Sequence, residues 1–246
     1  MAIWDDPQTR TERSGFNTAT VGVPRATRDA GLRSYMLSVY NYMASGVLLT
    51  GIVALGFASS GFAEQVLMTP LRWLLILAPF GFLIAMQAGL NRMRTSTLQV
   101  LFWAFAVTMG LSMSSIFLVY TGVSIAQTFF AAAAGFGALS LWGYTTKRDL
   151  SAWGSFLIVG VFGLLAAMLI NLWFLRSLGF QMLISAIGVL IFAGLTAYDT
   201  QRIKSMYAYV AGSDMVGKVV IMAALSLYLD FINMFMFLLQ FMGQRR

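Results

Sequence analysis

The stretch that decides the fold is residues 218–242, KVVIMAALSLYLDFINMFMFLLQFM. At a rise of about 1.5 Å per residue, a helix of this length crosses the ~30 Å hydrocarbon core of a membrane. Asp230 is its single acidic residue and lies at its centre. An ionised aspartate there costs roughly 2.5–3.5 kcal/mol on insertion, so Asp230 must be paired, protonated or lining a cavity. The candidate partner is Asp199, near the end of the preceding apolar run.

The composition of the whole chain indicates a polytopic membrane protein. Of the 246 residues, 59% are hydrophobic and only 10% are charged, whereas soluble domains carry about 25% charged residues. Cysteine and histidine are absent, which removes thiolate and imidazole groups for catalysis or metal binding. The net charge of +7 comes from short basic segments between apolar runs, which favours membrane topology over a nucleic-acid partner. We expect no enzyme activity, no catalytic residues, no resident metal and no cofactor.

Seven apolar stretches are each long enough to span a membrane, which predicts an all-α integral membrane protein. Residues 1–33 are polar and are interpreted as a mostly disordered cytoplasmic tail, and residues 34–246 as the seven-helix transmembrane domain. Trp73, Trp142, Trp153 and Trp173 fall near span ends, as interfacial anchors do. The predicted spans are 34–59, 71–91, 97–120, 124–146, 152–175, 179–201 and 217–242.

The distribution of basic residues predicts the orientation, because cytoplasmic loops retain positive charge. With the N-terminus in the cytoplasm, twelve of the 16 lysines and arginines lie inside, and Arg72, Arg176, Arg245 and Arg246 lie outside. A last segment that enters and returns would move Arg245 and Arg246 inside, so this alternative to seven full spans stays open. The absence of cysteine and of a signal peptide or presequence favours the inner membrane of a bacterium.

Helical spacing places polar side chains on one face of the last span. Ser226, Asn233 and Gln240 share this face with Asp230, so we expect the face to contact protein or line a pore. If Asp199 and Asp230 meet, both cannot ionise cheaply, and the pair would share a proton. Such a pair is a pH-sensing switch, because a repulsion of a few kcal/mol shifts a two-state equilibrium by orders of magnitude.

Two arginines and several small residues have alternative interpretations. Arg92 and Arg94 flank a short cytoplasmic turn, where they determine topology or act as a latch that holds a carboxylate. Small residues recur at four-residue spacing at 131–135, 133–137 and 46–50, which predicts close packing of helices.

Three segments resemble a known family. Residues 223–235, AALSLYLDFINMF, closely resemble the C-terminal signature of the Bax-inhibitor family, also called transmembrane Bax-inhibitor-motif proteins. Residues 197–204, AYDTQRIK, are similar to the end of the family's sixth span, and residues 147–151, KRDLS, to its turn into the fifth. The resemblance covers about residues 32 to 243 and identifies the chain as a bacterial member.

The resemblance implies a central C-terminal helix wrapped by the other six, and a passive, pH-sensitive calcium leak. Its aspartate pair corresponds to Asp199 and Asp230, and an arginine that can hold the sixth-span aspartate corresponds to Arg92, with Arg94 as the alternative. The second predicted span, 71–91, contains no acidic residue. A calcium-attracting carboxylate found there in some relatives is therefore missing, which puts calcium selectivity in doubt.

Two other functions remain open at this point. The first is a non-conducting protein that binds and regulates other membrane proteins, since Gly and Ala faces also suit partner helices. The second is an intramembrane aspartyl protease, because two aspartates on consecutive spans can act as general acid and base. Such proteases resemble a Gly-x-Gly-Asp pattern, whereas Leu227, Tyr228 and Leu229 precede Asp230. Between the three, an intramembrane carboxylate favours ion transport through the bilayer.

Overall fold

A computed structural model describes residues 25–246 and has seven helical segments long and apolar enough to cross a membrane. The all-α prediction and the seven spans are thus confirmed. The fourth and fifth helices together form the third span, and the seventh helix continues into a short π-helix, η1, to form the fifth span. The elements are α1 Arg25–Ser59, α2 Phe62–Leu67, α3 Leu71–Gly89, α4 Thr95–Met113, α5 Ser115–Val119, α6 Gly122–Thr145, α7 Ser151–Ile170, η1 Asn171–Leu175, α8 Leu178–Val210 and α9 Val216–Met242.

Two helices extend beyond the predicted spans. Helix α8 continues to Val210, nine residues past the predicted end at 201. The basic residues after 201 set the predicted boundary, but Ile203 and Tyr207 still pack inward there, and the Tyr207 ring lies 5.3 Å from that of Tyr35. Helix α1 starts at Arg25, within the segment assigned to the tail, whereas the rest of that segment lies outside the described residues.

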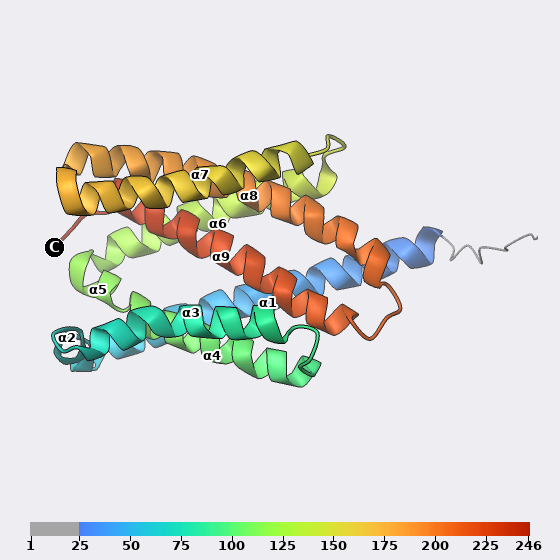
Figure 1. Cartoon of the computed structure of the whole chain (residues 1–246), viewed down its shortest axis with the longest axis horizontal. Helices are drawn as coiled ribbons and strands as arrows, with labels where there is room; N and C mark the ends of the chain where they lie inside the picture. The colour runs from blue at the N-terminus through green and yellow to red at the C-terminus, as the bar shows by residue number, and fades with distance from the viewer. Residues whose placement is uncertain (1–24) are drawn as a thin grey trace, which may run out of the picture.

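Helix α9 is the core of the molecule. In its most hydrophobic 18-residue window 72% of the residues are buried, against at most 39% in any other span. It contacts α8, α1, α6 and α4, and in Figure 1 it crosses obliquely between a group containing α6, α7 and α8 and another containing α1, α3 and α4. Helices α3 and α7 form an outer layer, packed on α4 and α8 respectively. The last helix is therefore interior, as predicted. Four of the other six spans contact it directly.

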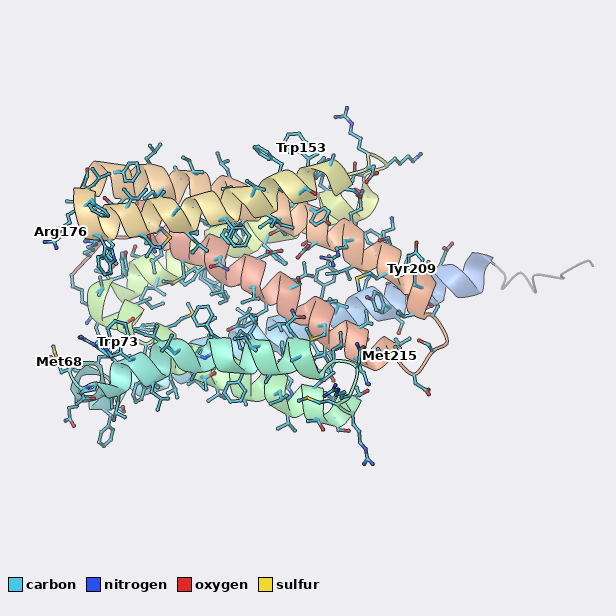
Figure 2. The ribbon with its side chains drawn as sticks, in the orientation of Figure 1. Met68, Trp73, Trp153, Arg176, Tyr209 and Met215 are labelled. Carbon is cyan, nitrogen blue, oxygen red and sulfur yellow. The ribbon has the colours of Figure 1, made fainter. Side chains whose placement is uncertain are left out.

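Helix α9 is continuous over 27 residues, or about 40 Å. Met215, at its start, lies at the end of the molecule where α1 begins, and the C-terminus lies at the opposite end (Figures 1 and 2). After α9, Gln244 accepts a hydrogen bond from the Thr121 amide, and Arg246 donates one to the Val119 carbonyl. This geometry matches a full span, and the alternative in which the segment enters and returns is wrong for this chain.

The lateral surface is apolar and carries aromatic residues at both ends. Trp73 is 57% exposed and Trp153 is 61% exposed, and Figure 2 shows them towards opposite ends of the bundle. Exposed tryptophans near span ends are typical of interfacial anchors. The apolar sides and the aromatic ends indicate that the chain is an integral membrane protein.

The close helix contacts differ from those predicted from small-residue spacing. Gly46 faces the ring of Phe102, as close packing requires, but Gly135 and Gly137 face open space, so the prediction for them is wrong. Among the glycines of α6, the close approach to another helix instead occurs at Gly143. A Cβ there would lie 3.0 Å from the Cα and carbonyl carbon of Ala197 and closer still to its carbonyl oxygen. Helices α6 and α8 therefore meet backbone to backbone, two residues before Asp199.

Candidate functional site

Helices α8 and α9 bring the two predicted aspartates into one buried region. Asp199 is 9% exposed and Asp230 is 5% exposed. The Ser226 hydroxyl of α9 donates a hydrogen bond of 2.8 Å to Oδ2 of Asp199 on α8. Ser226 precedes Asp230 by four residues, which is about 6 Å along a helix. Asp199 is thus bonded to the helix that carries Asp230, one turn away from the Asp230 carboxyl.

Asp230 is the less satisfied member of the pair. Its Oδ2 atom is buried and, among the described residues, has no hydrogen-bond partner. A buried charged oxygen without a partner is costly, because it loses its hydration and gains nothing in return. The other acidic side chain of the site, Asp199, is bonded to α9 one helical turn away, at Ser226. The site can therefore accept one more ligand at Oδ2, whether a proton, a water molecule or a cation.

The arginines considered for this site are exposed, whereas the two aspartates are buried. Arg92 and Arg94 are both exposed on the turn between α3 and α4, and their role as a latch stays a prediction. Arg202, three residues after Asp199 on α8, is exposed and places a positive charge on the same side of that helix. Sequence reasoning treated Arg202 only as a topology determinant. Its signal was its spacing, because residues three apart lie on the same side of a helix.

The polar stripe of α9 lies on the half-buried side of the helix and is anchored at both ends. Ser226 bonds to Asp199, and Gln240 accepts hydrogen bonds from Gln181 at 2.8 Å and from Ser185 at 3.4 Å. Between them, the Asn233 amide donates to the carbonyl of Leu229, four residues earlier in the same helix. The stripe thus contacts α8 at Ser226 and again at Gln240. Its role as the lining of a pore stays a prediction.

Sequence reasoning missed two polar contacts that hold α9 in place. The Tyr228 hydroxyl is fully buried and shares a 2.7 Å hydrogen bond with Thr50 of α1, which also bonds to the Ala106 carbonyl of α4. Near the C-terminal end of the helix, Asn171 donates to Gln181, which connects η1 to Gln240. The available signal was the presence of uncharged polar residues inside apolar spans, which form hydrogen bonds between membrane helices.

The loop before α7 is held against α8 by Gln201. Its side chain accepts from the Leu150 amide at 2.9 Å and donates to the Arg148 carbonyl at 2.8 Å. Next to it, hydrogen bonds from the Ser151 hydroxyl and amide lower the pKa of the exposed Asp149. Asp149 therefore stays ionised throughout the neutral range and cannot report pH changes there. Within residues 25–246 no three His, Cys, Asp or Glu side chains cluster as metal ligands would.

Comparison with known proteins assigns the chain to a family. The family model described as "Inhibitor of apoptosis-promoting Bax1" matches residues 32–246. The chain belongs to the Bax inhibitor family. This family assignment confirms the resemblance seen in the three sequence segments.

The Bax inhibitor chain has bacterial relatives that align over most of their length. It is 48% identical to the uncharacterized protein RP147 of Rickettsia prowazekii over 231 residues, covering 93% of this chain and 97% of that one. It is 43% identical to the inner membrane protein YbhL of Escherichia coli K12 over 221 residues, covering 88% and 94%. An uncharacterized protein of Caulobacter vibrioides is 42% identical over 230 residues, covering 89% and 91%.

Proposed function

We propose that this Bax inhibitor family protein is a pH-sensitive cation leak of the bacterial inner membrane, that calcium is the ion carried, and that Asp199 and Asp230 are the switch. The observation that carries the proposal is the buried Oδ2 of Asp230, which has no hydrogen-bond partner within residues 25–246 and lies one helical turn from the Ser226–Asp199 contact. The N-terminus is cytoplasmic in this proposal, as the basic residues predict. The proposal assigns no enzymatic reaction to the chain.

The proposed switch works through repulsion between the two carboxylates. With one proton shared, the Ser226 bond holds α8 and α9 together at the level of the pair. With both groups ionised, their repulsion raises the free energy of this arrangement; for two unit charges roughly 6 Å apart it is on the order of 3 kcal/mol at an effective dielectric constant of 20. That free energy shifts an equilibrium between two helix arrangements by roughly a hundredfold. Separation of α8 from α9 would expose the polar stripe of Ser226, Asn233 and Gln240 to water.

Calcium flux into proteoliposomes across a pH series tests the proposal. We expect a flux whose pH profile is flattened by Asp230→Asn and by Asp199→Asn, because each variant removes one of the two interacting charges. The control is Asp149→Asn, which removes an exposed acid on the loop before α7 and should leave the profile near neutral pH unchanged. The proposal fails if the purified protein carries no flux, or if both aspartate variants keep the wild-type profile.

The alternative function is a non-conducting protein that binds and regulates other membrane proteins. A regulatory protein that does not conduct ions would return a stoichiometric membrane partner on purification and would carry no calcium when reconstituted alone. The flux measurement therefore distinguishes the two functions directly.

A further inference from the structure

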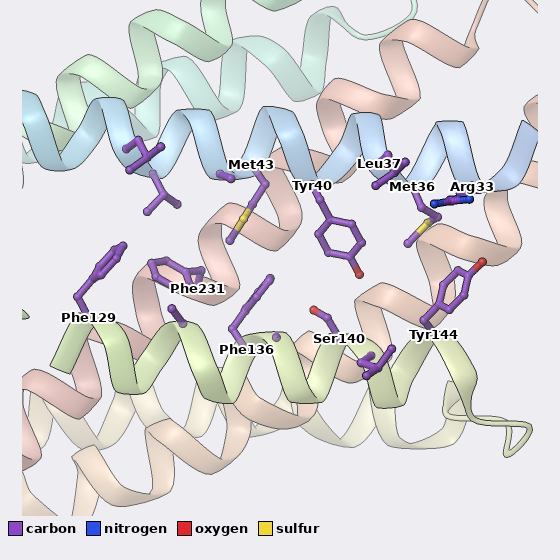
Figure 3. A pocket seen from close by; sticks show the side chains of 16 residues that line it. Arg33, Met36, Leu37, Tyr40, Met43, Phe129, Phe136, Ser140, Tyr144 and Phe231 are labelled. Atoms are coloured by element: carbon purple, nitrogen blue, oxygen red, sulfur yellow. The ribbon is translucent and has the colours of Figure 1, made fainter. Parts of the chain in front are cut away.

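A groove of about 770 Å³ runs between α1 and α6, outside the aspartate site. Figure 3 shows its two walls, with Met36 and Met43 projecting from α1, Phe129 and Phe136 from α6, and Phe231 of α9 behind them. These side chains are apolar, and nothing in the proposed leak requires a hollow at this place.

The groove opens sideways, where the membrane would lie. Its rim residues Leu37, Leu48 and Leu141 are 51%, 59% and 64% exposed. The lining residues on α1 extend from Arg33 to Leu48, which is about 22 Å along a helix. Half of a ~30 Å hydrocarbon core is about 15 Å. The groove is therefore long enough to hold an acyl chain over the full depth of one leaflet.

The end of the groove nearest the N-terminus is basic and polar. Arg33 lies there opposite Tyr144 (Figure 3). Lys204 of α8 donates a 2.7 Å hydrogen bond to the Tyr144 carbonyl, with its ammonium 4.6 Å from the centre of the Tyr144 ring. Arg33 at the mouth of an apolar groove, with the Lys204 charge next to the lining residue Tyr144, complements a phosphate group, which arginine binds by charge-assisted hydrogen bonds.

Two hydroxyl groups lie further along the groove. In Figure 3 the Tyr40 side chain projects from α1 towards Ser140 of α6. Ser140 accepts a hydrogen bond from Thr200 of α8 and so keeps its own hydroxyl hydrogen free to donate. Polar groups at this depth suit the ester carbonyls that follow a phosphate in a phospholipid.

We propose that this groove binds one anionic phospholipid, with its phosphate on Arg33 and an acyl chain between α1 and α6. The basic end lies on the side that the charge distribution assigns to the cytoplasm, where basic pockets between helices bind anionic headgroups. The inference does not depend on ion conduction.

Two glycines of α6 provide a matched pair of variants. A Cβ added at Gly137 or at Gly135 meets nothing within 4 Å, so a side chain added at either position starts in open space. Gly137 lines the groove and Gly135 does not. Gly137→Leu therefore fills the groove, whereas Gly135→Leu adds the same side chain to the same helix outside it.

Native mass spectrometry of the purified full chain, titrated with 1-palmitoyl-2-oleoyl phosphatidylglycerol, tests the proposal. We expect Arg33→Ala to weaken binding of this lipid about fivefold, as loss of one basic contact does, and Gly137→Leu to weaken binding of both this lipid and its phosphatidylcholine analogue. Arg148→Ala and Gly135→Leu, the charge and volume controls, should change binding less than about twofold, within the range of neutral surface substitutions.

Three results would overturn the proposal. The first is equal phosphatidylglycerol binding by Arg33→Ala and Arg148→Ala. The second is equal lipid binding by Gly137→Leu and Gly135→Leu. The third is a dimer or a copurified membrane protein that Gly137→Leu dissociates while lipid binding is unchanged, which would assign the groove to a protein. Thermal melting of each variant identifies any that has failed to fold. If Gly137→Leu has failed, Ala44→Leu, at another groove-lining position, replaces it.

Discussion

Gly143→Ala is the substitution that tests the packing around the aspartate pair most directly. The added Cβ would lie 3.0 Å from the Cα and carbonyl carbon of Ala197, and closer to the carbonyl oxygen, whereas ordinary contact begins at 3.4 Å. The opposing atoms are backbone, so they cannot move aside as the end of a flexible side chain can. Helix α6 must therefore shift away from α8 by several tenths of an ångström.

Overpacking of this kind costs about 1–3 kcal/mol, and the backbone contact places Gly143→Ala in the upper part of that range. For a chain of this size, 1 kcal/mol lowers the melting temperature by about 2–4 °C. We expect a loss of roughly 5–10 °C, measured by thermal unfolding of the purified protein in detergent. An unfolding titration in sodium dodecyl sulfate mixed micelles should give the same rank order.

Gly137→Ala is the matched control on the same helix. Its Cβ meets nothing within 4 Å, so no clash opposes it, and the higher helix propensity of alanine should leave the stability unchanged or raise it by up to about 1 kcal/mol. The packing argument is refuted if the two variants melt at the same temperature, or if Gly143→Ala is more stable than the wild type. In either case α6 and α8 would not be held at the spacing described here.

Three further predictions concern single polar contacts. Tyr228→Phe removes the hydrogen bond to Thr50 and should cost roughly 0.6–1.5 kcal/mol in the same micelle titration; a cost above about 3 kcal/mol would mean that the ring has also moved. Gln181→Leu leaves the two side-chain amides bonded to it without this partner, and we expect a loss of about 1–3 kcal/mol, whereas an unchanged midpoint would contradict this network. Because Ser151 lowers the pKa of Asp149, the associated stabilisation is present at neutral pH and is lost on acidification through that pKa. Asp149→Asn should therefore flatten the acid side of the stability profile, and an identical profile would show that the exposed pair contributes nothing.

The fold was predictable because lipid allows few solutions. Seven long apolar runs have to be helices, and an acid in the middle of the last run has to be turned away from lipid. These two arguments predicted the spans and the interior position of α9. The extension of α8 to Val210 was not predictable from hydropathy, because outside the membrane a helix continues as long as residues such as Tyr207 find packing partners.

The candidate site was predictable in its residues but not in its contacts. Composition singled out Asp199 and Asp230, yet helical spacing could not show that Ser226, and not Asp230, bonds to Asp199. That outcome depends on the rotation and depth of α9 against α8, which the close approach at Gly143 and the anchor at Tyr228 help to set. Small-residue spacing failed at Gly135 and Gly137 for the same reason, since a glycine shows only that close approach is sterically allowed.

The central position of α9 has a consequence for biosynthesis. Helices are inserted in chain order, and α9 follows the six other spans. Until it enters the membrane, the helices that contact it, α1, α4, α6 and α8, have no common core to pack against. The earlier spans can therefore pack mainly as two groups, α1 with α3 and α4, and α6 with α7 and α8. An interruption of translation before residue 216 should then produce a chain that is inserted but not fully assembled. Quality-control proteases of the membrane would meet this protein at that stage, with the surfaces destined for α9 still facing lipid.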